Sequence, residues 1–121
     1  MAKAKVLKIP ARGEWAFAEV ETDKDGVLPV EALEDAVGSW VEYWQLGEAG
    51  FPRLDMFFNE EGKLDGLSFN IVATRLSGIL VHDDCIVGDV VVCAHNDEYQ
   101  YIGLSEKDEL SLRRRLAELG F

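Results

Sequence analysis

The segment Ile86–Val92 constrains the fold most strongly, because most of its residues are apolar and β-branched. A short apolar run of this kind is typical of a central strand that is buried on both faces. We therefore interpret the other segments as the strands and helices that surround this strand.

Alternation of polar and apolar residues predicts further strands, separated by turn residues. The expected strands are Lys3–Ile9, Glu14–Glu21, Ser39–Leu46, Arg53–Asn59 and Tyr99–Leu104. The first two should form a hairpin around Pro10–Gly13, and Tyr99–Leu104 should pair with the central strand. Asn59–Lys63 predicts another hairpin turn, in which Gly62 would adopt a positive φ.

Three segments have the start signals of helices. One begins at Pro29, runs to about Val37 and is capped by Gly38. Asn70 should cap a helix that ends near Leu76, and Ser105, with Asp108 three residues later, should cap the last helix. The sequence thus predicts an α+β fold in one domain of residues 1–121, a mostly antiparallel, mixed-order sheet with two or three helices packed on it.

The charge is strongly acidic and unevenly placed. The net charge is −11, and the stretch from Gly13 to Gly62 holds 13 acidic residues against two basic ones. Such a surface repels nucleic acid and anionic membranes, so we expect neither as a direct partner. No apolar run approaches the roughly 20 residues of a membrane span, and the first residues do not resemble a secretory signal. We therefore expect a cytoplasmic protein.

Two patterns could bind metal ions, and neither has the required spacing. Asp23–Gly26 resembles part of an EF-hand loop, but no carboxylate stands at the last ligand position, so it is interpreted as a turn. His82, Cys85, Cys93 and His95 are zinc-type ligands. The two cysteines flank the predicted central strand and would lie about 26 Å apart, which argues against a shared ion or a disulfide.

Signals for catalysis are weak. His82, Asp83, Asp84 and Cys85 are adjacent, but neighbouring residues of an extended chain point in opposite directions. The chain has no phosphate-binding loop, dinucleotide fingerprint or nucleophile elbow. We expect a non-catalytic protein without a metal or another cofactor.

The aromatic segment around Trp40 is the strongest candidate for a binding surface. In a strand, Trp40, Glu42 and Trp44 share one face. If exposed, this face suits a cationic group, an arginine-bearing partner or a stacked base. If buried, the tryptophans belong to the core and Glu42 requires a partner such as Arg53 or Arg75. Near the chain's end, Arg113–Arg115 match the negative end of the last helix dipole.

Several segments, in this order, resemble the domain of unknown function 3846 family, which occurs in phages, mobile elements and their bacterial hosts. They are Leu33, Val37–Glu42, Asn59–Leu67, Asn70 with Ala73 and Thr74, and Ile86–Val92. The chain departs from the family pattern at Ser39, where a second glycine is frequent, and at Phe69, where proline is frequent. The resemblance implies a small accessory domain of phage or mobile-element origin and assigns no activity.

These observations lead to two hypotheses about function. The first is a protein that binds a host or phage protein in the host cytoplasm, with Trp40 and Trp44 as anchors and the acidic region steering association. In a more specific version of this hypothesis, the acidic surface imitates nucleic acid and occupies the binding site of a defence nuclease or a repressor. The alternative is a protein that binds or sequesters a nucleotide-like ligand, held by Arg53, Arg75, Asn59 and Asn70. Either version is compatible with a homodimer.

Overall fold

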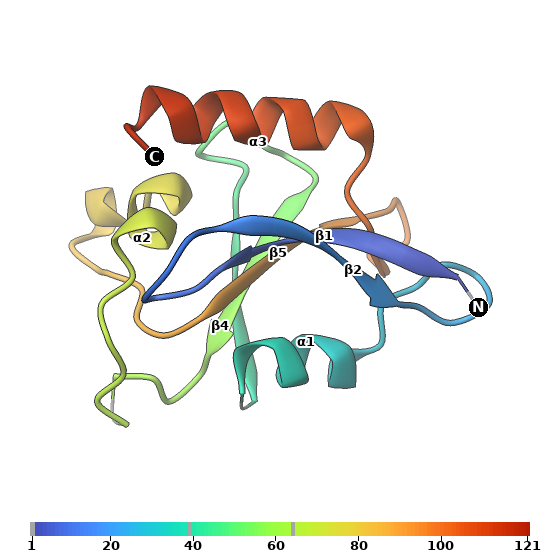
Figure 1. The fold of residues 1–121 in the computed structure, drawn as a ribbon, viewed down its shortest axis with the longest axis horizontal. Coiled ribbons are helices and arrows are strands. Elements are labelled where there is room, and N and C mark those ends of the chain that lie inside the picture. Colours follow the sequence, from blue (N-terminus) through green and yellow to red (C-terminus); the bar gives the residue numbers. More distant parts are fainter. Residues whose placement is uncertain (1, 39, 64) are drawn as a thin grey trace.

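A computed structural model describes residues 2–38, 40–63 and 65–121. In these residues one antiparallel sheet lies between helices on its two faces, as Figure 1 shows. The strands are β1 (Lys3–Ile9), β2 (Ala16–Glu21), β3 (Val41–Gln45), β4 (Leu54–Asn59), β5 (Val90–His95) and β6 (Tyr101–Ile102). The helices are α1 (Val30–Val37), α2 (Ile71–Ser77) and α3 (Glu106–Glu118), with a short 3₁₀ turn, η1 (Ile79–His82), after α2. The predicted α+β class is confirmed.

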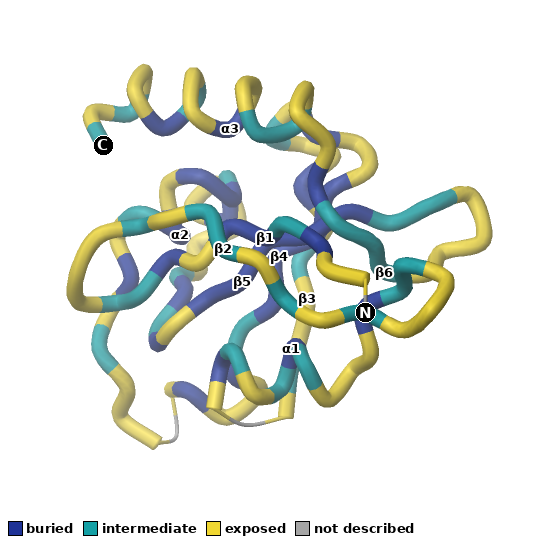
Figure 2. Tube along the Cα trace, turned by 45° about the vertical axis from the view of Figure 1, so that its right-hand side comes forward, coloured by how far each residue is buried: buried dark blue, intermediate teal, exposed yellow. Residues whose placement is uncertain are grey.

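The strands are arranged in the order β2-β1-β5-β4-β3, and β6 pairs with the end of β5. β1 and β2 form the predicted hairpin, with Leu7 opposite Phe17. β5 lies between β1 and β4, with Val92 opposite both Leu7 and Met56. Its residues are almost all buried, as the dark trace in Figure 2 shows, which confirms a central strand buried on both faces.

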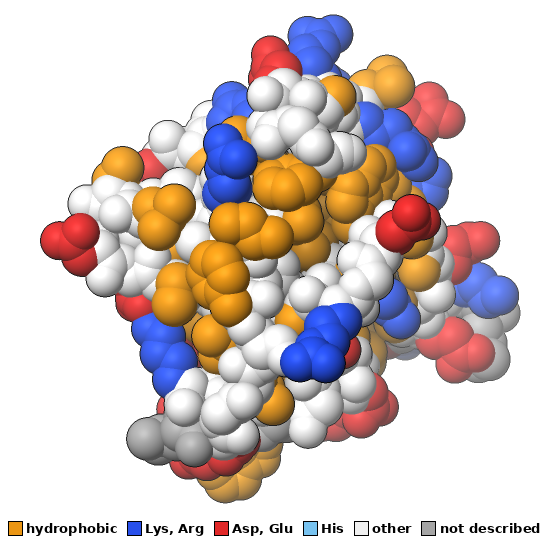
Figure 3. All heavy atoms as spheres, turned by 60° about the vertical axis from the view of Figure 1, so that its left-hand side comes forward, with side chains coloured by type: hydrophobic (Ala, Val, Ile, Leu, Met, Phe, Trp, Pro, Cys, Tyr) orange, Lys and Arg blue, Asp and Glu red, His pale blue; other side chains and the backbone are white. Residues whose placement is uncertain are grey.

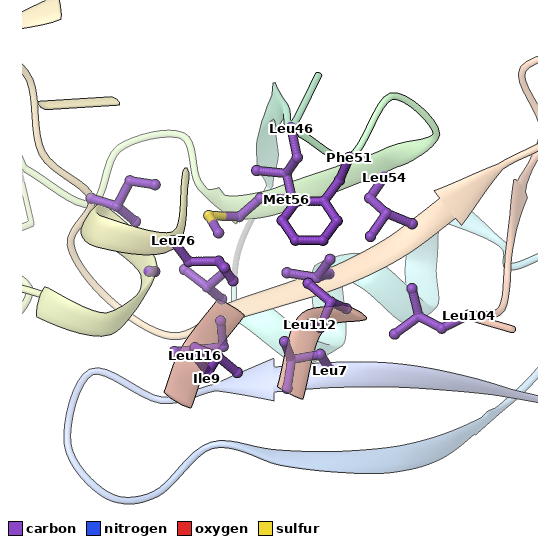
Figure 4. Packing of buried hydrophobic residues seen from close by; sticks show 14 of the residues in the cluster. Leu7, Ile9, Leu46, Phe51, Leu54, Met56, Leu76, Leu104, Leu112 and Leu116 are labelled. Carbon is purple, nitrogen blue, oxygen red and sulfur yellow. The ribbon is translucent and has the colours of Figure 1, made fainter. Parts of the chain in front are cut away.

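Each face of the sheet has its own hydrophobic core. Helices α2 and α3 cover one face, where Leu76, Leu112 and Leu116 pack on Leu7 and Met56 (Figure 4). Helix α1 covers the other face with a smaller cluster, built from Val6, Leu28, Leu33, Phe57 and Val91 among others. At about 25 cal/mol for each square ångström of apolar surface removed from water, these two layers supply the main stabilisation of the fold.

The three helices begin and end where local signals indicate. Gly38, in the left-handed conformation at φ 82°, ends α1 and donates its N–H to the carbonyl of Glu34 at 2.8 Å. Asn70 caps α2 by accepting the N–H of Ala73, and Ser105 and Asp108 form a reciprocal capping box at the start of α3. None of the described helices has the length and apolar character needed to cross a membrane.

The local predictions for the start of the central strand and for the turn after Asn59 are wrong. The central strand begins at Val90 rather than Ile86, because Gly88 turns the chain at φ 79° and the Ile86 carbonyl accepts the N–H of Asn70 instead of joining the sheet. The turn after Asn59 is no hairpin turn, since β4 pairs with β3 and β5 and the chain continues to α2.

Gly62 has a steric role in place of the expected positive φ. A Cβ atom at Gly62 would lie only 2.9 Å from Cγ2 of Val87, so a larger residue would push this turn away from the segment that precedes β5. Several other predicted strands are longer than observed, since β2 begins at Ala16 rather than Glu14 and the predicted strand Tyr99–Leu104 is reduced to Tyr101–Ile102. Ser39, at the start of one predicted strand, and Leu64, which contributes to the family resemblance, lie outside the described residues.

Candidate functional site

The aromatic segment that the sequence indicated forms an edge of the sheet. β3 is the last strand in the sheet order, and in the described chain no strand pairs with its outer side. Trp40 precedes the strand and is 70% exposed. Trp44 is partly buried: its Nε1 donates to the carbonyl of Ser77 at 3.1 Å, and its ring meets His82 edge-on at 5.4 Å. One tryptophan is therefore available at the surface while the other helps to hold α2 and η1 on the sheet.

The hydrogen-bond register identifies the backbone groups that point out from this edge. Glu60 donates its N–H to the carbonyl of Trp40, and Leu46 donates to the carbonyl of Leu54, each at 3.0 Å. Bonding and non-bonding positions alternate along an antiparallel pair, so the even-numbered residues of β3 face β4. The N–H and C=O groups of Val41, Tyr43 and Gln45 consequently face away from the sheet.

A shallow hollow lies beside this edge. Its volume is about 420 Å³, and it is lined by Tyr43, Trp44, Gln45, Gly47 and Glu48. The Tyr43 side chain is half exposed, on the opposite face of the strand from Trp40, and its ring lies 6.1 Å from that of Phe57. An extended segment placed in the hollow would meet unpaired backbone groups along its length and an aromatic side chain on either side.

Three of the predicted binding residues line one pocket next to β3. Glu42, Trp44 and Asn59 contribute to a cavity of about 180 Å³. Its polar rim includes an ion pair between Lys63 and Asp84. The hydrogen bond of this pair raises the pKa of Lys63 and lowers that of Asp84. The other lining residues are Phe58, Glu60, Glu61, Gly62, Ile79, Cys85 and Val87.

The other predicted binding residues lie elsewhere. Asn70 is 1% exposed, and its amide nitrogen donates to the carbonyls of Ile9 and Gly88, so it is part of the packing of α2. Arg53 immediately precedes β4 and pairs with Asp97, whereas Asn59 is the last residue of that strand. A strand of this length spans about 17 Å, so the two side chains lie at opposite ends of it. Arg75 lies on α2 with its guanidinium over the ring of Phe121. The structure does not bring these four side chains together around one ligand.

The zinc-type ligands have other partners in the structure. Nε2 of His82 lies 3.0 Å from a carboxylate oxygen of Glu48, and Nδ1 of His95 lies 2.7 Å from one of Asp55. Over residues 2–38, 40–63 and 65–121, no three His, Cys, Asp or Glu side chains converge as a metal site would require. The Asp23 carboxylate accepts the N–H groups of Asp25 and Val27, which confirms the turn predicted there.

One polar cluster was not found from the sequence. Asp55 is completely buried and accepts hydrogen bonds from His95 and, at 3.3 Å, from the hydroxyl of Tyr99. Gln45 in turn donates to that hydroxyl, so the cluster reaches the β3 edge. An acidic residue within the otherwise apolar strand Leu54–Phe58 is the signal that could have revealed it, because a buried carboxylate requires partners.

The buried thiol beside this cluster is not suited to nucleophilic chemistry. Cys93 lies directly opposite Asp55 in the sheet. Burial, with a further contribution from the Asp55 carboxylate, raises the pKa of Cys93 well above its ordinary value. Since the thiolate is the reactive form, the raised pKa disfavours nucleophilic chemistry at this thiol in the folded protein.

Comparison with known proteins places the chain in a family. No curated protein and no solved structure matches it. The model of one family, described as a domain of unknown function (DUF3846), matches residues 4–117, nearly the whole chain. The protein is therefore a member of the DUF3846 family.

Proposed function

We propose that this protein is a non-catalytic binding module that pairs the outer edge of β3 with an extended segment of a partner protein. The observation that carries the proposal is the open edge itself, where the backbone groups of Val41, Tyr43 and Gln45 face solvent beside a hollow of about 420 Å³. Addition of a strand to such an edge is a common mode of peptide recognition, in which the backbone supplies affinity and alternate side chains supply specificity.

The charge around this edge favours a basic partner segment. Glu42 is exposed on β3, Glu48 follows the strand, and Glu60 is exposed across from Trp40. A lysine or arginine on the incoming strand could approach both Glu42 and the exposed indole of Trp40, which attracts cations through its ring face. The net charge of −11 would steer such a partner toward the protein at low ionic strength.

The family context supports a particular kind of partner. The chain resembles proteins of phages and mobile elements, so we place its action in the cytoplasm of a bacterial host, on a host or phage protein. Proteins that bind nucleic acid do so through basic surfaces, and an acidic protein could occupy such a surface on a host or phage protein. Nucleic-acid mimicry against a defence nuclease or a repressor is thus the sharper form of the proposal.

The test is quantitative capture of host proteins by the tagged wild type and by matched variants. Tyr43→Pro removes an outward N–H and the ring, whereas Tyr43→Ala removes the ring alone and keeps the N–H. Proline is tolerated at outward positions of edge strands, so the fold should persist, and circular dichroism checks this. We expect a captured protein to be lost with Tyr43→Pro, retained in part with Tyr43→Ala, and reduced with Trp40→Ala.

The salt dependence of capture and the oligomeric state of the protein provide two further tests. Capture should fall steeply between about 50 mM and about 300 mM salt if the acidic edge steers binding, and indifference to salt would sink that part of the proposal. Equal capture by the proline and alanine variants would reject strand pairing at β3. If the protein is instead a dimer that Tyr43→Pro dissociates, the edge pairs with a second copy rather than with a different protein.

A further inference from the structure

A second hollow lies on the side of the molecule where α2 meets the end of α3. It is a groove of about 390 Å³, lined by Gly13, Glu14, Trp15, Val72 and Phe121, and it is named here the Trp15 groove. Trp15 and Phe121 are only partly buried, so their rings are accessible from the groove. Figure 3 shows this side of the molecule, with hydrophobic side chains gathered in the middle and both basic and acidic side chains around them.

Both aromatic walls of the groove carry an arginine. The Cζ atom of Arg75 lies 5.7 Å from the ring centre of Phe121. Opposite, Cζ of Arg113 lies 5.7 Å from the ring centre of Trp15 and 4.6 Å from that of Phe17. Guanidinium groups therefore lie over the aromatic rings of the groove, whereas, among the described residues, the one charged residue that lines it is Glu14. Aromatic rings with guanidinium groups beside them attract ligands that have both a planar ring and an anionic group.

The two arginines differ in how far their charge is compensated. Arg113 is held by Glu109, with its Nε 2.9 Å from the carboxylate. Arg75 is exposed, and within the described part of the chain no carboxylate lies within ion-pairing distance of it. In a chain with 23 acidic and 12 basic residues, an arginine that contacts an aromatic ring but no carboxylate keeps its charge available to a bound anion.

We propose that the Trp15 groove binds a nucleoside monophosphate unit, with the base against Trp15 and Phe121 and the phosphate on Arg75. Base–aromatic stacking and a bidentate guanidinium–phosphate contact are the interactions that these side chains are suited to make. The net charge of −11 opposes the approach of a long polyanion, which favours a free nucleotide over a nucleic-acid strand. This site is separate from the β3 edge and does not depend on the function proposed for that edge.

Isothermal titration calorimetry with adenosine 5′-monophosphate tests the site. We expect the wild type to bind this probe more tightly than adenosine or inorganic phosphate alone, because each of these makes only one of the two contacts. Arg75→Gln should weaken binding roughly tenfold or more, the usual effect of losing a charge-assisted hydrogen bond. Arg53→Gln is the matched control, since it makes the same chemical change at a distant exposed site and should leave the affinity unchanged.

A substitution in the opposite direction sharpens the test. Glu14→Gln removes a negative charge from the groove wall and should tighten binding about threefold, while Glu98→Gln, in an exposed turn near β6, should not. Absence of heat with wild type at millimolar nucleotide, or equal affinity of wild type and Arg75→Gln, would overturn the proposal. If a short oligoadenylate binds more tightly than the mononucleotide and shows the same dependence on Arg75, the groove binds a nucleotide within a single-stranded nucleic acid rather than a free nucleotide.

Discussion

Nδ1 of His95 lies 2.7 Å from Oδ2 of Asp55, and the carboxylate that holds this ring is completely buried. Tyr99 stacks on the other side of the pair, with its ring 4.0 Å from that of His95 and only 11° from parallel. Tyr99 adopts a positive φ of 59°, a conformation unfavourable for a bulky residue, and this geometry places its ring over the imidazole. The cluster thus fastens the turn between β5 and β6 to the neighbouring strand β4.

Asp55→Ala should lower the free energy of unfolding by about 2–3 kcal/mol, because it leaves the His95 ring and the Tyr99 hydroxyl without their buried acceptor. Asp55→Asn keeps an acceptor oxygen and should cost less. Urea denaturation followed by circular dichroism measures both. Asp97→Asn, on the same turn, alters only an exposed ion pair with Arg53 and should change stability by less than about 0.5 kcal/mol. Equal effects of Asp55→Ala and Asp97→Asn would mean that the buried cluster contributes nothing.

Asn70 should prove to be a structural residue, although the sequence placed it among the ligand contacts. Its side chain accepts the N–H of Ala73 and donates to two buried carbonyls, those of Ile9 and Gly88. Asn70→Asp preserves the cap but sets a carboxylate against both carbonyl oxygens, so we expect a loss of at least about 2 kcal/mol in urea denaturation. A urea midpoint for Asn70→Asp equal to that of the wild type would show that the two donated hydrogen bonds do not contribute to stability.

The two cysteines should differ sharply in reactivity. Cys93 is fully buried with a raised thiol pKa, whereas Cys85 is partly exposed. In the native protein at about pH 8, iodoacetamide should therefore modify Cys85 alone, and denaturant should expose both thiols. Peptide mass spectrometry identifies the modified residue, and Cys85→Ser should abolish labelling of the native state. Rapid modification of Cys93 under native conditions is the contrary result.

Stability should decline in alkaline solution. Burial, and then the charge of Asp55, raises the pKa of Tyr101 above 10.0, its ordinary value. The folded state therefore keeps this proton at a pH where the unfolded chain has lost it, so stability is complete below about pH 10 and falls as pH rises further. The hydrogen bond to Glu109 raises the pKa of Lys5, which acts in the same direction.

Tyr101→Phe tests the contribution of the phenol. Urea titrations of wild type and variant at about pH 8 and about pH 11 should show a smaller alkaline loss for the variant, since phenylalanine has no proton to release. Lys5→Met provides a second comparison, at a surface position. An alkaline loss of the same size in Tyr101→Phe and wild type would assign the effect to other groups.

Trp44→Ala should destabilise the protein by about 3 kcal/mol, while Trp40→Ala should leave stability within about 0.5 kcal/mol of wild type. Trp44 packs on the core and donates to Ser77, whereas Trp40 is mostly exposed. Thermal denaturation of the two variants separates the roles. A large loss for Trp40→Ala would indicate packing that its exposure does not suggest.

Elements with short-range signals could be predicted from the sequence. The capping box of Ser105 and Asp108 and the Asn70 cap each join residues three apart, so the local pattern contains the whole interaction. Alternation likewise placed Trp40, Glu42 and Trp44 on one face. It could not tell which tryptophan is exposed, because the cover over Trp44 comes from η1, more than thirty residues later.

The features that the sequence did not predict depend on contacts between residues far apart in the chain. Asp55 and His95 are 40 positions apart and meet only because β4 and β5 are neighbours in the sheet. The start of β5 was misplaced for a similar reason, since the carbonyl of Ile86 is taken by Asn70 rather than by another strand. A propensity for extended structure does not reveal which partner a backbone group will find.

The sheet order also has a consequence for synthesis on the ribosome. The β1–β2 and β3–β4 pairs each join strands that follow one another in the chain, but only β5 connects the two pairs. Until Val90–His95 has emerged, the nascent chain can form two separate ribbons, with β1 and β4 each missing a partner on one side. Unpaired strand edges of this kind bind chaperones and promote aggregation. Once this six-residue segment has left the exit tunnel, β1 and β4 gain a shared partner, and the open edges of the described sheet are those of β2 and β3.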